Sequence, residues 1–364
     1  MRKRSSYIDL VLNPFNLLRT QRILKVNPTI IPERKEPDTV QIYVYDYDSD
    51  VLHQKQLTDI GDCFSYKNTP TITWINIDGI RRKDVEQICA HYNIHNLIVE
   101  DILSIGQRPK FDDIEDTIFC LMNMLYFNER DATVEAEQVS LVMGRNFVIS
   151  FQEDGSRDVF NLLRDKLQLR NHKIRQRGTD YLYYTLIDLI VDHYFVVMEK
   201  LSEKIEVLEE DIIRNANKRS LARINMLRKE MIILKRNIAP VRELINGILR
   251  SESDLLDERT EKYFKDVYDH IIQANDLAEN YRDMMMNLQD LYLSNVNLKM
   301  NEVMKVMAVV TCLLAPATVI GGMFGMNFDV IPYSHHQWGF YLACALMLCI
   351  PLAMLYIFRK RGWF

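Results

Sequence analysis

Two uncharged stretches near the C-terminal end constrain the fold of this 364-residue chain more than any other feature. Val306–Phe328 has 23 residues, Trp338–Phe358 has 21, and neither contains Asp, Glu, Lys or Arg. At about 1.5 Å per residue, a helix of either length covers roughly 30 Å, the thickness of a bilayer hydrocarbon core. A buried core helix can be equally apolar, but two such stretches side by side predict a pair of membrane-spanning helices.

The charges that flank these stretches predict their orientation. Arg359, Lys360 and Arg361 form a basic tail, whereas the loop 327–337 contains no Lys or Arg. Basic residues gather on the cytoplasmic side of membrane proteins. We therefore expect the tail in the cytoplasm and the loop outside. Two spans then place the N-terminal part in the cytoplasm as well.

Composition argues against several classes of function. The net charge of -5 gives no support to a nucleic-acid partner. The six cysteines form no CxxC pair, which indicates small apolar residues in a reducing compartment and not a disulfide framework or zinc site. Residues 1–39 carry several basic residues together with Pro28, Pro32 and Pro37, and we expect a flexible leader there.

An enzymatic role finds little support in the sequence. The segment 81–95 has helical spacing, so His91 and His95 form an i,i+4 pair on one helix face, a geometry that metals favour. No third ligand is evident from the spacing, and there is no Ser/His or Cys/His arrangement and no GxxxxGK[ST] loop. We therefore predict that the protein is not an enzyme and that these histidines are ordinary hydrogen-bonded or solvated side chains.

Hydrophobic periodicity predicts an α+β chain with a cytoplasmic α/β domain. The segments "QIYVYDYD", "TITWINIDGI" and "IFCLMNMLYF" are typical of strands, and "VSLVMGRNFVISFQE" of a hairpin that turns at residues 144–146. After Gly178 two long amphipathic helices follow, and Pro240 predicts a kink or break in the second.

A very long helix is expected next, because the 68 residues from Ile248 to Ala315 contain neither Gly nor Pro. About 60 helical residues would run without a break into the first span. The predicted parts are a leader (1–39), an α/β and helical domain (40–250), a stalk helix (251–305), a first span (306–326), an external loop (327–337), a second span (338–358) and a basic tail (359–364).

One face of the first span is small and weakly polar. Steps of three and four residues keep these side chains on one side of a helix, and the same direction reaches Asp290 further upstream. Small residues, including the Gly321/Gly325 pair, are also typical of close helix packing. The alternative is a pore, which would need several copies because each chain has only two spans. The residues of the face are Asn301, Met304, Ala308, Thr311, Ala315, Thr318, Gly322 and Gly325.

At this point the sequence resembles a known family. "FGMNF" (Phe324–Phe328) lies between the two spans, with "DLYLSNVNLKMNEVMKVM" before it and a basic tail after it. This arrangement closely resembles the CorA family of bacterial magnesium transporters. Upstream, "VEDILSIGQRPK", "EQVSLV", "DYLYYTLIDLIVDHYF" and "YFKDVYDH" extend the resemblance over residues 40–364.

The resemblance implies a funnel-shaped homopentamer in the cell inner membrane, with Mg²⁺ as the transported and regulatory ion and Co²⁺ and Ni²⁺ as further substrates. Five long helices would surround the pore, and the second spans would form an outer ring. Gly325, Met326 and Asn327 would form the mouth, where amide oxygens bind the water shell of Mg²⁺. The pore would be lined by Asp290, Asn301, Met304, Met307, Thr311, Ala315, Thr318 and Gly322, with the two methionines as an apolar constriction.

The resemblance also implies a Mg²⁺ sensor at the subunit interfaces. Asp101 and Asp266 match the family's acidic pair, with Glu100 and Asp269 as acidic neighbours. Carboxylates brought together repel, and a bound cation would relieve the repulsion and hold the pore closed at high internal Mg²⁺. The tail Arg359–Arg361 resembles the family's basic collar, although a topology signal explains it equally well.

The external loop departs from the family pattern and keeps two alternatives open. Tyr333 stands where the family commonly has an acid, and Asp329 is the only carboxylate of the loop. His335 and His336 offer imidazoles to zinc or another transition metal, whereas Met326 favours magnesium, because the zinc-exporting branch usually has GIN in place of GMN. Besides a magnesium transporter and a transition-metal transporter, the third hypothesis is a non-conducting membrane scaffold, which predicts that Asn327 is dispensable.

Overall fold

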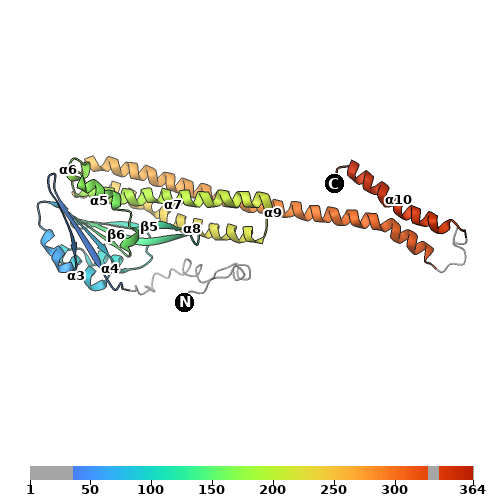
Figure 1. Ribbon diagram of the computed structural model, residues 1–364. Helices are drawn as coiled ribbons and strands as arrows, with labels where there is room; N and C mark the ends of the chain where they lie inside the picture. Colours follow the sequence, from blue (N-terminus) through green and yellow to red (C-terminus); the bar gives the residue numbers. More distant parts are fainter. Residues whose placement is uncertain (1–35, 327–335, 364) are drawn as a thin grey trace. The chain divides into compact units, whose positions relative to one another are not determined.

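The computed structural model describes residues 36–326 and 336–363, which divide into two units (Figure 1). Of the described residues, the first unit comprises 36–211 and 218–289, and the second comprises 212–217 and 290–363. The predicted leader lies largely outside the described residues, as do Asn327 and most of the external loop.

The first unit contains a seven-stranded sheet in the order β2-β1-β3-β7-β6-β5-β4. The β3–β7 pair is parallel, and every other neighbouring pair is antiparallel. The predicted hairpin is confirmed, because β6 and β7 pair directly. The strands are β1 (Gln41–Tyr47), β2 (Leu52–Leu57), β3 (Ile72–Asp78), β4 (Lys110–Ile114), β5 (Thr117–Asn128), β6 (Thr133–Met143) and β7 (Phe147–Gln152).

Both faces of the sheet are covered, and alternate residues of a strand serve different layers (Figure 1). Ile75 and Ile77 of β3 join the apolar cluster that includes helices α3 (Arg82–Tyr92) and α4 (Asn96–Leu103). Helices α7 (Thr179–Asn215) and α8 (Lys218–Arg250) cover the other face. There the Tyr194 hydroxyl donates to the Asn123 carbonyl at 2.8 Å.

Short elements complete the first unit. A 3-10 turn, η1, sits between β2 and β3, and a second, η2, follows β7 together with two short helices. All six cysteines are free, in agreement with the sequence. The bounds are η1 (Ile60–Tyr66), η2 (Gly155–Arg157), α5 (Asn161–Gln168) and α6 (Lys173–Gln176).

Helix α8 continues through Pro240, so the predicted break at this residue was wrong. Proline removes one backbone donor and crowds the preceding turn. Ile238 and Val241, on either side of it, are fully buried, so tertiary packing holds the helical course through the proline.

The long helix α9 (Glu258–Phe324) has 67 residues and is continuous, but it begins at Glu258 and not at the predicted residue 251. The preceding segment satisfies its backbone locally: the Ser253 amide donates to the Ser251 hydroxyl oxygen at 3.2 Å. The Asp257 carboxylate then accepts from the Arg259 amide at 2.8 Å, the geometry of a helix N-cap.

Three described helices are long and apolar enough to cross a bilayer: α7, α9 and α10 (Gly339–Lys360). The most apolar segment of α7 is 67% buried within the chain, whereas those of α9 and α10 are only 6% buried. The α+β class, with a long helix leading to two apolar C-terminal helices, is thereby confirmed.

Candidate ion pathway and metal sites

The weakly polar face of α9 is open in the single chain. Its two methionines, Met304 and Met307, are 56% and 63% exposed, whereas Val309 is buried. All described members of the predicted pore lining and mouth are exposed as well, so this chain does not cover the face: Asp290, Asn301, Met304, Met307, Ala308, Thr311, Ala315, Thr318, Gly322, Gly325 and Met326.

The threonine hydroxyls on this face have a defined orientation. Thr311 Oγ1 donates to the Met307 carbonyl at 2.9 Å, and Thr318 Oγ1 donates to the Leu314 carbonyl at 3.0 Å. Because each hydrogen is used within the helix, the hydroxyl oxygen remains free to accept. Such oxygens suit the hydrogens of a hydrated cation.

Two adjacent glycines of α9 have different surroundings. A Cβ at Gly321 would lie 3.6 Å from Met347 Cε of α10, whereas a Cβ at Gly322 would meet nothing within 4 Å. Gly321 thus serves the packing of the two apolar helices against each other. Gly322 faces open space in the single chain, and its place in the pore lining stays a prediction.

The sensor candidate Asp101 lies on α4 and is well paired within its own chain. Lys110 Nζ, from β4, donates to Asp101 Oδ2, and Gln107 Nε2 donates to Asp101 Oδ1 at 3.0 Å. Burial by itself lowers the pKa of Lys110, but the hydrogen bonds and charges of Asp101 and Asp112 together outweigh burial, and the net pKa is raised. The neighbouring Glu100 is exposed and lines a cleft of about 350 Å³.

The other half of the predicted sensor, Asp266 with Asp269, lies exposed on α9. Among residues 36–326 and 336–363 no hydrogen bond or ion pair joins Asp101 to Asp266. The sequence predicts this pair across two subunits, so it stays a prediction.

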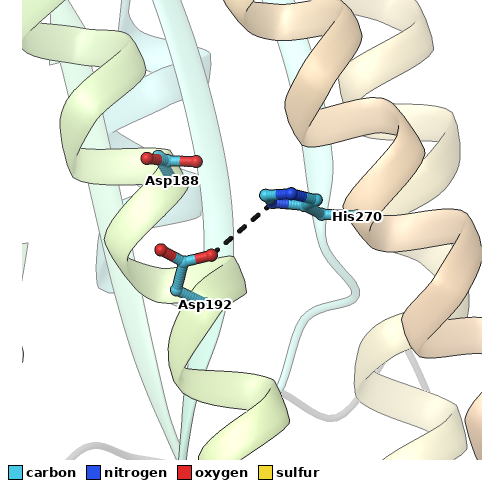
Figure 2. Close-up of side chains that lie close together, drawn as sticks. All are labelled: Asp188, Asp192 and His270. Carbon is cyan, nitrogen blue, oxygen red and sulfur yellow. Dashed lines mark ion pairs between the residues drawn. The ribbon is translucent and has the colours of Figure 1, made fainter.

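Asp188, Asp192 and His270 form a cluster with metal-ligand geometry (Figure 2). The first two lie four residues apart on α7 and the third lies on α9, and their ligand atoms are within 4.8 Å of one another. His270 Nδ1 lies 3.6 Å from Asp192 Oδ1. Burial, reinforced by the charge of Asp192, raises the pKa of Asp188 to about 6.

The sequence interpretation missed this cluster. The four-residue spacing of Asp188 and Asp192 within an apolar run was a usable signal. The third member could not be inferred, because His270 lies about eighty residues away and reaches the pair only through helix packing.

The histidine pair singled out from the sequence does not form a site. Helix α3 ends at Tyr92, and Asn93 adopts the left-handed conformation with φ 57°. His91 then stacks on Phe64 at a centroid distance of 4.2 Å. His95 begins the next helix, where its Nδ1 accepts from the Leu97 amide. The expectation of ordinary hydrogen-bonded histidines is confirmed, and the expectation that both lie on one helix face was wrong.

The basic residues near the C-terminal end close α10. Arg359 and Lys360 lie in its last turn, where cations interact favourably with the helix dipole. The Arg361 amide donates to the Ile357 carbonyl at 3.0 Å. Phe358 and Trp363 stack with a centroid distance of 5.2 Å.

Comparison with known proteins identifies the family. The model of the CorA-like Mg²⁺ transporter protein family matches residues 70–360. The cobalt/magnesium transport protein CorA of Thermotoga maritima is 37% identical over 336 residues, covering 92% of this chain and 95% of the relative. The zinc transport protein ZntB of Yersinia pseudotuberculosis is 19% identical over 290 residues, 80% of this chain and 87% of its own.

The fold matches a solved structure of the same family. The structure of the complete CorA magnesium transporter from Methanocaldococcus jannaschii has a TM-score of 0.71 at 22% identity, covering 91% of this chain and 100% of its own. This likeness concerns the fold, while the family match rests on sequence. The chain therefore belongs to the CorA-like Mg²⁺ transporter proteins, a family of membrane transporters and not of enzymes.

Proposed function

We propose that the protein is a homopentameric channel for divalent cations in the cell inner membrane, with Mg²⁺ as the main substrate and Co²⁺ and Ni²⁺ as further ones. The observation that carries the proposal is the exposed face of α9, which is small and weakly polar within the uncharged, otherwise apolar segment that begins at Val306. Of the helices in residues 36–326 and 336–363, we assign only α9 and α10 to the membrane, so several copies would have to share the pathway.

Ion selection follows from hydration chemistry. Mg²⁺ gives up its water reluctantly, so a pathway that binds the hydrated ion needs acceptors for water hydrogens. The Thr311 and Thr318 oxygens supply such acceptors, and the amide of Asn327 is proposed to supply a ring at the outer mouth. Gly325 and Met326 complete the proposed mouth.

The driving force is the membrane potential. It is worth about 2.3 kcal/mol per elementary charge per 100 mV, so a divalent cation gains roughly 4.6 kcal/mol on entry. That free energy corresponds to about three decades in concentration ratio, and it requires no nucleotide. Met304 and Met307 are proposed to close the pathway by dewetting.

Gating is proposed to respond to internal Mg²⁺ through Asp101 and Asp266 of adjacent subunits, with Glu100 and Asp269 close by. Because Lys110 already pairs with Asp101, Mg²⁺ must compete with this ammonium for the carboxylate. The bound ion would hold neighbouring subunits together, and its loss would leave repelling carboxylates and open the pore. Arg359, Lys360 and Arg361 are proposed to form a basic collar on the cytoplasmic side.

The test is divalent uptake into liposomes that contain the purified protein. Asn327→Ala is compared with Gln337→Ala, a control that removes another carboxamide on the same side of the membrane. We expect Asn327→Ala to lower Mg²⁺ uptake at least tenfold and the control to stay near the wild type. Equal uptake in all three proteins would remove the proposed mouth, and Zn²⁺ uptake far above Mg²⁺ uptake would support a zinc transporter instead.

A second measurement addresses the sensor. Asp266→Ala is expected to leave uptake less inhibited by internal Mg²⁺, whereas Asp276→Ala, an exposed aspartate on the same helix, is expected to leave the inhibition unchanged. Identical inhibition curves for both variants would contradict the sensor role of Asp266.

A further inference from the structure

The turn between α7 and α8 lies against α9 close to the start of its uncharged segment (Figure 1). We propose that this basic turn, defined as residues 212–222, binds the phosphates of anionic lipid headgroups. The lipids belong to the same bilayer that α9 and α10 cross, on the side that carries the first unit. Such binding is independent of ion conduction.

The charge of the chain changes sign at the basic turn. Residues 203–211 contain five acidic residues and one lysine, whereas residues 212–222 contain three basic residues and no acid. Asp211 and Arg223, which flank the basic turn, form an ion pair with each other, so these two charges at its border cancel. The turn itself therefore carries a formal charge of +3. Its three basic residues are all exposed: Arg214, Lys218 and Arg219.

Hydrogen bonds hold the basic turn against α9. Asn295 Nδ2 donates to the Ile212 carbonyl at 3.2 Å, and Lys299 Nζ donates to the Ala216 carbonyl at 3.1 Å. This part of the turn belongs to the same unit as the apolar helices. Lys218 follows two residues later, and at about 3.8 Å per residue it cannot lie more than about 8 Å from Ala216. The basic side chains are therefore held close to α9.

The contact with α9 places the basic turn near the depth of the lipid headgroups. Lys299 precedes Val306, the first residue of the uncharged stretch, by seven residues. At about 1.5 Å per residue of helix, this separation is at most about 10 Å along the membrane normal. Headgroups extend about 5–7 Å beyond the hydrocarbon core, and the field of an anionic surface extends about 8 Å further at physiological salt. Basic side chains on the turn can therefore reach lipid phosphates.

The composition of the basic turn suits a lipid surface. Ile213 is 60% exposed and stands beside Arg214 in the sequence. Segments at a membrane surface combine Lys and Arg with apolar side chains, and basic segments next to a span attract anionic lipids. Arginine also donates paired hydrogen bonds to phosphate oxygens. The bilayer that α9 crosses is already adjacent, so no further partner has to be recruited.

The experiment measures amide hydrogen exchange of residues 212–222 in the full-length protein, in nanodiscs of phosphatidylcholine with and without phosphatidylglycerol. Exchange is expected to be at least about threefold slower with phosphatidylglycerol, because bound headgroups oppose local opening of the turn. Salt at about 1 M shortens the Debye length to about 3 Å and is expected to remove the difference.

Two matched variants locate the effect. The first removes the three charges of the basic turn: Arg214→Gln, Lys218→Gln and Arg219→Gln. The control removes three charges from exposed positions elsewhere in the first unit: Lys55→Gln, Lys83→Gln and Arg170→Gln. The lipid dependence is expected to disappear in the first variant and to persist in the control. The amides of β5 serve as the folding control and are expected to exchange alike in all samples.

Three outcomes would overturn the proposal. The first is equal exchange of residues 212–222 in the two kinds of nanodisc for the wild type. The second is slow exchange in both kinds that the turn variant loses, which would assign the basic turn to an acidic surface of another protein chain. The third is protection by inorganic phosphate in discs of phosphatidylcholine alone, which would assign it to free phosphate. No transport is measured, so none of these results bears on the proposed channel.

Discussion

The two units use apolar helices in opposite ways. In the first unit the chain itself buries most of the apolar segment of α7, whereas in the second unit the apolar segments of α9 and α10 are almost entirely uncovered. Apolar composition indicates that a helix is stabilised when its side chains are removed from water, because the burial of apolar area is the main favourable contribution to folding. The rest of the fold determines what surrounds the apolar side chains of such a helix.

Along its own length, helix α9 changes from apolar side chains that the chain buries to apolar side chains that it leaves uncovered. Its buried residues follow helical spacing through the first unit and reach Tyr292, and none of residues 293–308 is buried. The apolar side chains beyond that point therefore need lipid or other copies of the chain. The buried stripe consists of Phe264, Val267, Ile271, Ala274, Ala278, Tyr281, Met285, Leu288 and Tyr292.

A matched pair of leucines gives the largest expected contrast. Leu186 of α7 is fully buried, whereas Leu298 of α9 is 62% exposed. Leu186→Ala is expected to lower the free energy of unfolding by about 2–5 kcal/mol, because it leaves a cavity. For an exposed residue such as Leu298 the change is about 0.5 kcal/mol or less. Chemical unfolding in detergent, followed by circular dichroism, measures both.

The outcome for Leu298→Ala sharpens the comparison. A loss comparable to that of Leu186→Ala would mean that another copy covers Leu298 in the assembly. Equal and small losses for both variants would contradict the burial of α7.

A buried acid in the first unit predicts a pH dependence. Glu137 of β6 is buried and accepts from the Glu153 and Asp154 amides at 2.9 and 2.8 Å. Burial raises its pKa from 4.5 to about 7, even though these hydrogen bonds act in the opposite direction. The folded state therefore keeps a proton between pH 4.5 and 7 that the unfolded state has lost, and stability falls as pH rises through this range.

Glu137→Gln removes this titration. The variant is expected to gain stability relative to the wild type between pH 4.5 and pH 8, by up to about 3 kcal/mol at 1.36 kcal/mol per pKa unit. Denaturant unfolding at several pH values measures the difference. Parallel stability curves for the two proteins would show that Glu137 titrates normally.

A smaller effect is expected where the end of α7 meets α9 within the second unit. Lys299 Nζ donates to Asn215 Oδ1 and, at 3.1 Å, to the Ala216 carbonyl, and Asn295 Nδ2 donates to the Ile212 carbonyl at 3.2 Å. The carbonyls at a helix C-terminus lack partners within the helix and attract cations. These side chains therefore cap α7 from α9.

Lys299→Ala is expected to cost about 1–2 kcal/mol of local stability, because it removes a charged cap. Hydrogen exchange at the amides of residues 208–216 is expected to accelerate about tenfold. Lys265→Ala, which removes a surface pair with Glu261, is the control and is expected to leave this segment unchanged. Unchanged exchange in Lys299→Ala would mean that the contact contributes nothing to the end of α7.

The features of this protein that could be predicted are those that depend on the local sequence pattern alone. The two C-terminal helices follow from length and absence of charge, and the strands β1, β3, β5 and the β6–β7 hairpin follow from alternation. The start of α9 was missed because Ser251, Ser253 and Asp257 satisfy the backbone through their side chains. Helix-forming composition does not reveal this competition.

The candidate sites also differ in whether a local sequence pattern could predict them. Periodicity identified the weakly polar face of α9, because all its members lie on one helix. The cluster of Asp188, Asp192 and His270 depends on how α7 packs against α9, and no local pattern contains that information. The prediction that His91 and His95 share one helix face was wrong for a local reason. Asn93 between them adopts the left-handed conformation and separates two helices.

The smallest expected effect on stability comes from the neighbouring glycines of α9, and it separates packing from conduction. Gly321→Ala and Gly322→Ala both place a methyl group where nothing lies closer than 3.6 Å, so both are expected to fold. Alanine favours a helix over glycine by about 1 kcal/mol, so neither variant is expected to lose stability. Gly321→Ala adds a methyl group beside Met347 of α10, away from the proposed pathway.

Uptake into liposomes then distinguishes the two positions. Gly322→Ala is expected to lower Mg²⁺ uptake, because five added methyl groups would narrow the proposed pore, while Gly321→Ala is expected to transport near the wild-type rate. Equal uptake by both variants would show that Gly322 does not line the pathway. A loss confined to Gly321→Ala would reverse the assignment of the two faces and place α10 where we place the pore.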